Sequence, residues 1–365
     1  MRTTAVIIAI LTNCLVPTTA AAPVQIGYPG LVYIDPEFEP GGTRVVFQDT
    51  QYRAWVGFLH PATGKCLSAT CRDILVATDL QPGSDFSRPF NGPEWGVSAS
   101  GSAIHLTKYA GETLQSWRVL PDGTGLTQIT SAAEGTSGSL ASVAPTASTV
   151  RLIVARGAVG PDLGAAWVDT AVGAINPMPG FWWGGQTGRF LPGSARIAIY
   201  PWRSDSNYQL AVVDTDRLAT QVVTTGAGQK SEPFGFLWQG KRYAGALLDR
   251  TSLVIYEPGT APWPQIAELT PPAPGWLFSL EPVGDTGCFV VALQNAPDQS
   301  YTDAAIYLTC LNGTWTRIDD GAVTARRSEP EPWRSPTGQW FVYWNDGSGS
   351  MWVVPISQRP EDALP

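Results

Sequence analysis

Short hydrophobic runs recur along the chain, and turns rich in glycine, serine or proline separate them. An aromatic or aliphatic residue, a tight turn and a β-rich run form one unit, as in FEPGGTRVVF at residues 38–47 and its near copy FLPGSARIAI at residues 190–199. Further units of this type begin at Trp95, Val143, Phe236, Leu280 and Trp333. Runs this short, bounded by turn residues, are typical of β-strands. The pattern predicts an all-β protein built from seven copies of one unit.

The spacing of the units indicates the architecture. They begin 44 to 57 residues apart, which is too long for ankyrin or tetratricopeptide repeats and fits a four-stranded propeller blade. In the first unit, the strands RVVF and AWVGFL follow the tight turn, and PATGK leads to a short fourth strand. We predict a closed β-propeller with seven four-stranded antiparallel blades. Six blades is the alternative, because the third unit is weakly marked.

The seventh unit lacks a fourth strand of its own. It ends at MWVVPIS, and only QRPEDALP follows. The segment VQIGYPGLVYI, residues 24–34, lies before the first unit. We expect this segment to pair with MWVVPI and close the ring, because closure removes the exposed strand edges of an open array.

The last unit resembles a known repeat. Residues 328–356, SEPEPWRSPTGQWFVYWNDGSGSMWVVPI, are similar to the repeat of TolB-like propellers, the PD40 or WD40-like group, which reads acid-Pro-x-Trp-Ser-Pro-Asp-Gly before two strands. Trp333, Ser335, Pro336 and Gly338 match, and Thr337 replaces the usual Asp. The resemblance implies a propeller fold over residues 30–357 and no particular activity.

The first residues have the pattern of a secretory signal peptide. Arg2 is followed by the apolar run AVIIAILTNCLV and then by small residues. We expect a signal peptide over residues 1–22, cleaved near Ala20 to Ala22, and a single propeller domain over residues 23–365. No later apolar run is longer, so no transmembrane helix is predicted. The protein is therefore expected to be secreted or periplasmic.

Four of the five cysteines agree with export. Cys66 and Cys71 are close in sequence, and Cys288 and Cys310 bracket a segment whose ends can pair as an antiparallel hairpin. We predict two disulfides, Cys66 with Cys71 and Cys288 with Cys310, as is common outside the cytoplasm. Zinc binding is disfavoured, because the cysteine spacing does not fit and the chain has only two His.

The charge of the chain narrows the range of partners. There are 31 acidic residues against 23 basic ones, and no cluster of Lys and Arg. Nucleic acid is therefore disfavoured, because its binding depends on neutralising phosphates. We expect a monomer that binds a small molecule, a glycan or a protein.

Long connections between blades share one face of a propeller with the loops between second and third strands, and we expect any site on this loop-rich face. Trp182 and Trp183 in FWW, and Trp202 and Arg203 in PWRSDSNY, fall there, and Trp276 lies near the start of the sixth unit. Such rings stack on sugars or flat apolar ligands, and Arg203 suits a carboxylate. The alternative is that these tryptophans pack between blades.

Acidic residues occupy similar positions at the start of several inner strands. They are Asp35 and Glu37 in DPEF, Glu94 in GPEW, Glu232 in SEPFGF and Glu329 in SEPEPW. We expect them at the mouth of the central channel, where carboxylates would bind a cation such as Ca²⁺ or keep one proton for general acid catalysis. The alternative is that each accepts hydrogen bonds from loop N–H groups or pairs with Arg189, Arg326 or Arg327, tying blades together. No cofactor is required.

Three function hypotheses remain open. We favour a secreted propeller that binds a ligand or partner on its loop-rich face. The second is a propeller enzyme, namely a lyase, lactone hydrolase or small-molecule cyclase, with a pocket of Trp, Arg and carboxylate residues at the channel mouth. The third is a purely structural surface protein. A His-dependent enzyme is disfavoured, because His60 and His105 fall away from the loop-rich mouth.

Overall fold

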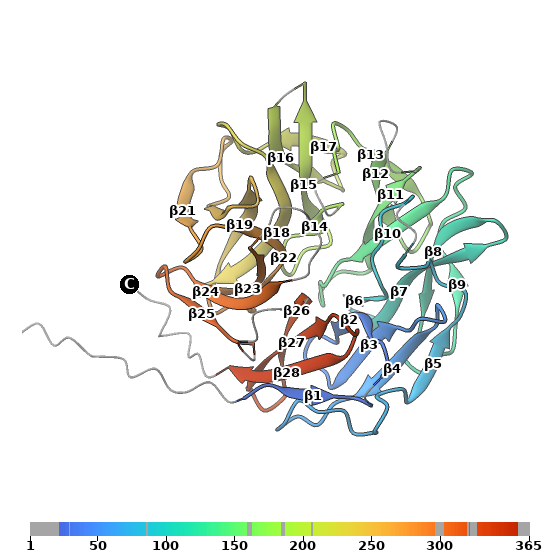
Figure 1. Ribbon diagram of the computed structural model, residues 1–365. Helices are drawn as coiled ribbons and strands as arrows, with labels where there is room; N and C mark the ends of the chain where they lie inside the picture. Colours follow the sequence, from blue (N-terminus) through green and yellow to red (C-terminus); the bar gives the residue numbers. More distant parts are fainter. Residues whose placement is uncertain are drawn as a thin grey trace, which may run out of the picture.

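Seven β-sheets are arranged around a central axis in the computed structural model (Figure 1). The structure describes residues 22–28, 30–84, 87–158, 163–183, 187–205, 207–295, 303–319, 321 and 327–356. Each sheet contains four antiparallel strands, so the predicted seven-bladed propeller is confirmed. This described part of the chain contains no helix, and hence none that could cross a bilayer. The predicted signal peptide lies outside the described residues, apart from Ala22.

The strands of each blade follow one another from the axis outwards, except at the seventh blade, where the first strand of the chain is outermost. From the innermost strand outwards they are: first blade, β2 (Ile34–Phe38), β3 (Arg44–Gln48), β4 (Ala54–Phe58) and β5 (Ile74–Ala77); second blade, β6 (Glu94–Ser98), β7 (Gly101–Ala110), β8 (Thr113–Val119) and β9 (Thr127–Gln128); third blade, β10 (Thr136–Ala141), β11 (Arg151–Arg156), β12 (Gly164–Asp169) and β13 (Ile175–Met178); fourth blade, β14 (Arg189–Phe190), β15 (Ile197–Ser204), β16 (Asn207–Asp214) and β17 (Ala219–Val222); fifth blade, β18 (Lys230–Trp238), β19 (Lys241–Leu248), β20 (Ser252–Tyr256) and β21 (Gln265–Leu269); sixth blade, β22 (Trp276–Pro282), β23 (Cys288–Gln294), β24 (Ala304–Cys310) and β25 (Trp315–Arg317); seventh blade, β26 (Arg327–Arg334), β27 (Trp340–Asp346), β28 (Met351–Ile356) and β1 (Val24–Ile26).

The two near-identical sequence segments form the same turn in different blades. Gly41, between β2 and β3, and Gly193, between β14 and β15, both have a φ of about 70° (73° and 67°), a conformation that glycine adopts at low cost. Turns of this kind join first to second strands, on the face opposite to the loop-rich face. We call this opposite face the tight-turn face.

The ring closes through pairing of the chain's first and last strands. β1 lies beside β28 in Figure 1, with Val24 opposite Val353 and Ile26 opposite Met351. The predicted closure is confirmed, but the strand is shorter than the predicted segment 24–34. Residues 27–28 and 30–33 lie outside any strand, and Ile34 already begins the innermost strand of the first blade.

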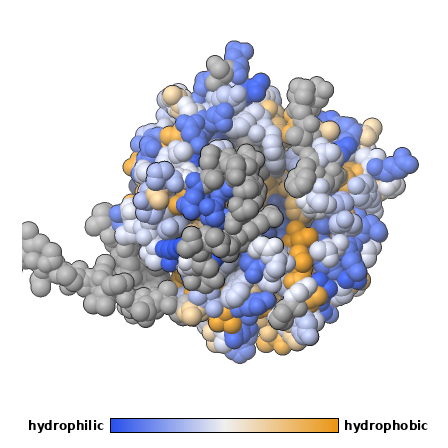
Figure 2. Space-filling model, viewed as in Figure 1, coloured by the Kyte–Doolittle hydropathy of each residue, from blue (hydrophilic) through white to orange (hydrophobic). Residues whose placement is uncertain are grey.

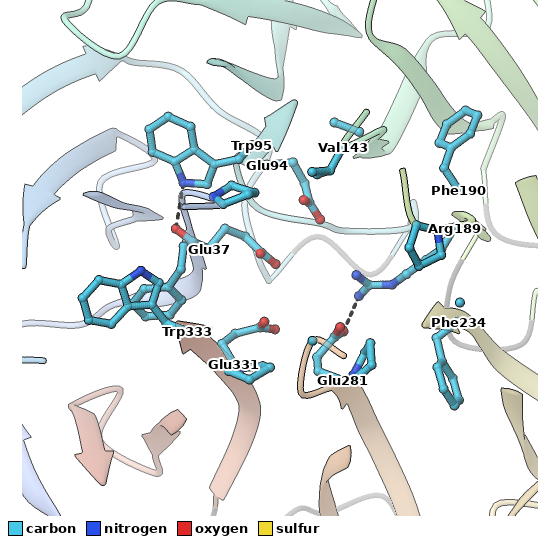
Figure 3. Close-up of a pocket in the computed structure, with 18 of the residues that line it drawn as sticks. Glu37, Glu94, Trp95, Val143, Arg189, Phe190, Phe234, Glu281, Glu331 and Trp333 are labelled. Carbon is cyan, nitrogen blue, oxygen red and sulfur yellow. Dashed lines mark hydrogen bonds and ion pairs between the residues drawn. The ribbon is translucent and has the colours of Figure 1, made fainter. Parts of the chain in front are cut away.

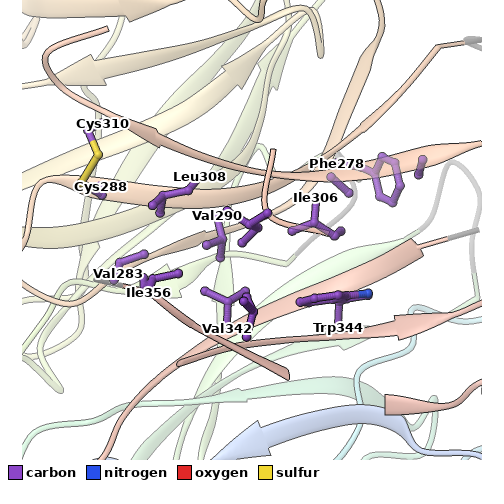
Figure 4. Close-up of a cluster of buried hydrophobic side chains, with 14 residues drawn as sticks. Phe278, Val283, Cys288, Val290, Ile306, Leu308, Cys310, Val342, Trp344 and Ile356 are labelled. Carbon is purple, nitrogen blue, oxygen red and sulfur yellow. A yellow bond between two sulfur atoms is a disulfide. The ribbon is translucent and has the colours of Figure 1, made fainter. Parts of the chain in front are cut away.

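The hydrophobic core lies between neighbouring blades. Figure 4 shows one such layer, formed by residues of the sixth blade, Val290, Ile306 and Leu308, and of the seventh, Val342, Trp344 and Ile356, with the Cys288–Cys310 disulfide beside it. Both predicted disulfides, this one and Cys66–Cys71, are present. Burying each such side chain stabilises the fold by about 1.5–3 kcal/mol, so every blade depends on its neighbours.

The interface between the second and third blades is different, because hydroxyl groups fill part of it. The hydroxyl of Ser116 lies 3.1 Å from that of Thr136 and 2.9 Å from that of Ser139, and Thr130 lies 2.8 Å from Thr136. All four side chains are buried. A strand that packs through Ser and Thr has a weak hydrophobic pattern, which explains why the third unit is weakly marked in the sequence.

Candidate ligand site in the central channel

The innermost strand of five blades carries a β-bulge near its start. One residue in each bulge has a positive φ, between 47° and 57°: Asp35, Gly138, Glu232, Ser279 and Glu329. A bulge rotates the strand locally and changes where the next side chains point. The residues two positions further along are Glu37, Leu140, Phe234, Glu281 and Glu331.

These five residues, with Glu94 on β6 and Arg189 on β14, give the channel one residue from every blade. All seven line a cavity of about 450 Å³. Figure 3 shows the carboxylates of Glu37, Glu94, Glu281 and Glu331 and the guanidinium of Arg189 pointing towards one another across it.

Two buried tryptophans form part of the cavity wall. The indole N–H of Trp95 donates to the backbone oxygen of Glu37 at 2.9 Å, and that of Trp333 donates to the backbone oxygen of Gly42 at 3.1 Å. Each bond joins two neighbouring blades, so the rings are held in place. Gly41, Gly193 and other turn residues also line the cavity. The cavity therefore opens on the tight-turn face, opposite to the face where the sequence led us to expect a site.

The loop-rich end of the channel holds a smaller cavity of about 170 Å³. Asp35, Glu329 and Trp183 line it, so three residues of the predicted site do lie together. Leu140 lines both cavities, which places them next to each other along the channel.

Figure 2 shows a mostly hydrophilic surface with hydrophobic residues near β6 and β7.

The larger cavity holds more acidic groups than basic ones. Arg189 forms an ion pair with Glu281, and the Asn91 side-chain amide donates to Glu94 at 3.0 Å. The carboxylates of Glu37 and Glu331 make no hydrogen bond or ion pair within the part of the chain that the structure describes. Two of the four carboxylates thus face the open cavity without a partner.

Burial and mutual repulsion shift the titration of these groups. Burial raises the pKa of Glu94 and of Glu281 to about 7, against the opposing effect of Arg189. Burial and the neighbouring carboxylates raise the pKa of Glu37 and Glu331 well above 4.5. Burial alone would lower the pKa of Arg189, but the attraction of the neighbouring carboxylates has the larger effect and raises this pKa. The four glutamates are therefore weaker acids than exposed glutamates, and Glu94 and Glu281 titrate near neutral pH.

The acids at the bulges have a different role, because they join neighbouring blades. Asp35 accepts a hydrogen bond from the backbone N–H of Gly92 in the connection to the second blade. Glu329 in the seventh blade accepts from the backbone N–H of Asp35 at 3.4 Å and from the Asn345 side chain at 2.6 Å. The structure thus supports, for Asp35 and Glu329, the alternative interpretation that such acids tie blades together.

Glu232 forms its ion pair within its own blade, and its second carboxylate oxygen is buried without a hydrogen-bond partner in the described structure. Its carboxylate lies 2.6 Å from the guanidinium of Arg250 in its own blade. Burial raises its pKa, whereas Arg250 and the backbone N–H groups of Ser279 and Leu280 in the sixth blade lower it. Of the arginines considered as partners, Arg189 binds Glu281 and Arg327 lies 3.6 Å from Asp319, while Arg326 lies outside the described residues.

The predicted aromatic residues do not form one platform. Trp182 packs edge-on against Tyr208 with ring centres 5.0 Å apart, and exposed Arg203 lies 5.7 Å from the centre of the same ring. Trp202 packs against the hydrophobic cluster between the third and fourth blades. Trp276 packs against the cluster between the sixth and seventh blades, with Arg250 5.3 Å from its ring centre. Trp183 alone among these residues lines the channel cavities given above.

Sequence reasoning missed Glu281 and Glu331 and treated Arg189 only as a partner for other acids. A usable signal exists: a charged residue directly before an aromatic one at the end of an inner strand. It occurs as Glu37-Phe38 at the end of β2, and similar pairs are Glu94-Trp95 at the start of β6 and Arg189-Phe190, which form β14. Glu281 and Glu331 precede proline instead. Glu331 follows Glu329 by two positions across a bulge, just as Glu37 follows Asp35.

Comparisons with known proteins show the fold and no more. No protein-family model and no curated protein matches the chain. An oligogalacturonate lyase from Vibrio parahaemolyticus is 13% identical over 94% of this chain and 92% of that one, with a TM-score of 0.58. The β-propeller domain of Cps50 (Swd1) from Myceliophteria thermophila is 11% identical over 92% and 99%, with a TM-score of 0.60. An oligogalacturonate lyase in complex with manganese is 12% identical over 92% and 91%, with a TM-score of 0.52.

Among the described residues, no group of three or more His, Cys, Asp or Glu could hold a metal ion. His105 is fully buried in β7, and burial lowers its pKa to about 3, so it is neutral. His60 is exposed beside the turn that leads to the fourth strand of the first blade.

Proposed function

We propose that the protein is an exported, monomeric propeller that binds a small ligand in its central channel, entered from the tight-turn face. The observation that carries this proposal is the cavity of about 450 Å³. Every blade contributes to its lining, and the unpartnered carboxylates of Glu37 and Glu331 face into it. Ligand sites are commonly concave, partly apolar and equipped with a few convergent polar groups. The two disulfides suit the secreted or periplasmic location that the sequence predicts.

The lyases of similar fold suggest a substrate that this channel is poorly suited to bind. Oligogalacturonate is a chain of carboxylates, whereas five glutamates and two arginines line the cavity here; Arg189 is paired with Glu281, and Arg334 lies exposed at the rim. Like charges at short range repel. We therefore do not transfer lyase activity to this chain, and the TolB-like sequence resemblance adds no substrate.

An enzyme remains a second candidate because of one observation. Burial raises the pKa of Glu94 and Glu281 to about 7, the range in which a carboxyl group can donate and accept protons near neutral pH. Hydrolysis of a panel of lactones by the wild-type protein, abolished in Glu94→Gln, would support this candidate.

The binding proposal can be tested with a thermal-shift panel of galacturonate oligomers, neutral glycans, alkylamines and Ca²⁺. Val143 lines the mouth and is 36% exposed, so Val143→Trp should narrow the opening without disturbing the core. Val172→Trp, in a turn of the same blade where Val172 is 75% exposed and does not line the cavity, is the matched control. We expect at least one probe to shift the wild type and the control but not Val143→Trp.

Two outcomes would contradict this proposal. The first is a panel in which no probe shifts the wild-type protein. The second is a shift that persists in Val143→Trp and disappears in Trp183→Ala, which would locate binding at the loop-rich end of the channel, as the sequence suggested.

A further inference from the structure

A second, mainly apolar hollow continues from the channel across the tight-turn face. It has a volume of about 350 Å³, and Phe236 and Leu237 form part of its floor. Six of its residues also line the channel cavity: Pro192, Gly235, Pro282, Gly284, Arg334 and Trp340. The two hollows are therefore continuous, with an acidic inner part and an apolar outer part.

The inner part favours positive charge. The charged groups around it are Asp35 and Glu37 on β2, Glu94 on β6, Arg189 on β14, Glu281 on β22 and Glu331 on β26, and Glu232 on β18 lies close enough to raise the pKa of Glu281. A cation placed among them would relieve their repulsion, whereas an anion would add to it. Arg334 is exposed at the rim, where its guanidinium lies 5.8 Å from the centre of the Trp340 ring.

Resting on the proposed function, we infer that the ligand is an amphipathic cation: an ammonium or guanidinium group held by Glu37 and Glu331, joined to an apolar body that lies along Phe236, Leu237 and Trp340. The acidic inner hollow fits the charged end of such a molecule, and the apolar outer hollow fits its apolar end. The unpartnered carboxylates then gain charge-assisted hydrogen bonds.

Binding of such a cation is coupled to protons. Burial and repulsion raise the pKa of Glu37 and Glu331, so these carboxyl groups hold a proton more readily than exposed glutamates do. A bound cation favours their ionised form and takes the place of a proton. Affinity therefore increases with pH, and binding releases protons.

The test is calorimetric titration with n-alkylamines of increasing length, compared with n-hexanol and n-hexanoate. We expect the amines to bind, with affinity rising about fourfold for each added methylene while the outer hollow fills. Glu331→Gln should weaken n-hexylamine binding about tenfold or more, with Glu37→Gln as the second variant. Glu112→Gln, in an exposed turn of the second blade, should bind like the wild type. The measured heat should vary with the ionisation enthalpy of the buffer, reporting proton release.

The failure of this inference is distinguishable from failure of the proposed function. If n-hexanoate or galacturonate oligomers bind more tightly than n-hexylamine and Val143→Trp blocks them, the channel is a ligand site but the cationic class is wrong. If n-hexylamine binds equally well to wild type, Glu331→Gln and Glu37→Gln, the carboxylates do not recognise it and the inference is overturned. If no probe binds in the channel, the proposed function fails and the inference fails with it.

Discussion

At the scale of single residues, acids two positions apart on one strand have different roles. Asp35 hydrogen-bonds towards the second blade, whereas Glu37 faces the channel; Glu329 and Glu331 repeat this arrangement in the seventh blade. The bulge residue has a positive φ, which costs a non-glycine residue about 1–2 kcal/mol, and the hydrogen bond to its neighbour offsets part of that cost. Stability and binding should therefore respond separately to changes at the two positions.

Glu94 gives a pH-dependent prediction at this scale. Its pKa is about 7 in the folded protein and 4.5 ordinarily, so the folded state binds the extra proton and the wild type loses stability as pH rises through this window. Glu94→Gln removes the effect. The stability of the variant relative to wild type should therefore increase by roughly 2–3 kcal/mol between pH 4.5 and pH 8, measured by urea unfolding. Parallel stability profiles for the two proteins would contradict this.

His105 should show the opposite sign. Burial lowers its pKa from 6.5 to about 3, and neither ring nitrogen has a hydrogen-bond partner in the described structure. The unfolded chain takes up a proton there below pH 6.5, so the wild type loses stability as pH falls towards 3. His105→Leu should remove on the order of 3 kcal/mol of this acid sensitivity, visible as a lower midpoint of acid unfolding. An unchanged midpoint would show that other groups dominate the acid transition.

At the scale of elements, the strands were more predictable than the channel they surround. MWVVPI coincides with β28, and the copied segments at residues 38–47 and 190–199 form equivalent turns. The bulges were not predictable, because they occur at acid, serine and glycine alike, as at Glu232, Ser279 and Gly138. A bulge is decided by pairing with the adjacent strand, and no local sequence pattern records it.

The hydroxyl network between the second and third blades gives an element-scale prediction. Ser116→Ala removes the partner of Thr136 and Ser139, whose hydroxyls stay buried with fewer hydrogen bonds. The free energy of unfolding should fall by about 1–3 kcal/mol in urea. Ser100→Ala, in the exposed turn between β6 and β7, should change it little. Equal stabilities for the two variants would mean that the network contributes nothing beyond packing.

At the scale of the whole molecule, the period of the repeat predicts the number of blades but not which end of the channel holds the larger cavity. The seven-bladed closed ring follows from unit spacing and from the missing strand of the last unit. The width of the channel depends on which inner-strand side chains face inwards in every blade at once. Leu140, Phe234 and Arg189 contribute to that layer with no common residue type. The sequence therefore predicted carboxylates at the channel but placed the site at the loop-rich end, which holds the smaller of the two channel cavities.

Closure of the ring depends on a very short strand. β1 has three residues, yet Ile26 is 3% exposed and packs in the cluster between the seventh and first blades. A variant chain that begins at Tyr28 would lose this strand and leave the backbone of β28 unpaired at an open edge. We expect a melting temperature lower by roughly 5 °C and concentration-dependent association, measured by calorimetry and light scattering. Val24→Pro should reproduce part of the loss by removing a backbone donor opposite Val353, and Val24→Ala should not. If the shortened chain melts like the full one and stays monomeric, the blades hold the ring together without β1, and core packing between blades is sufficient.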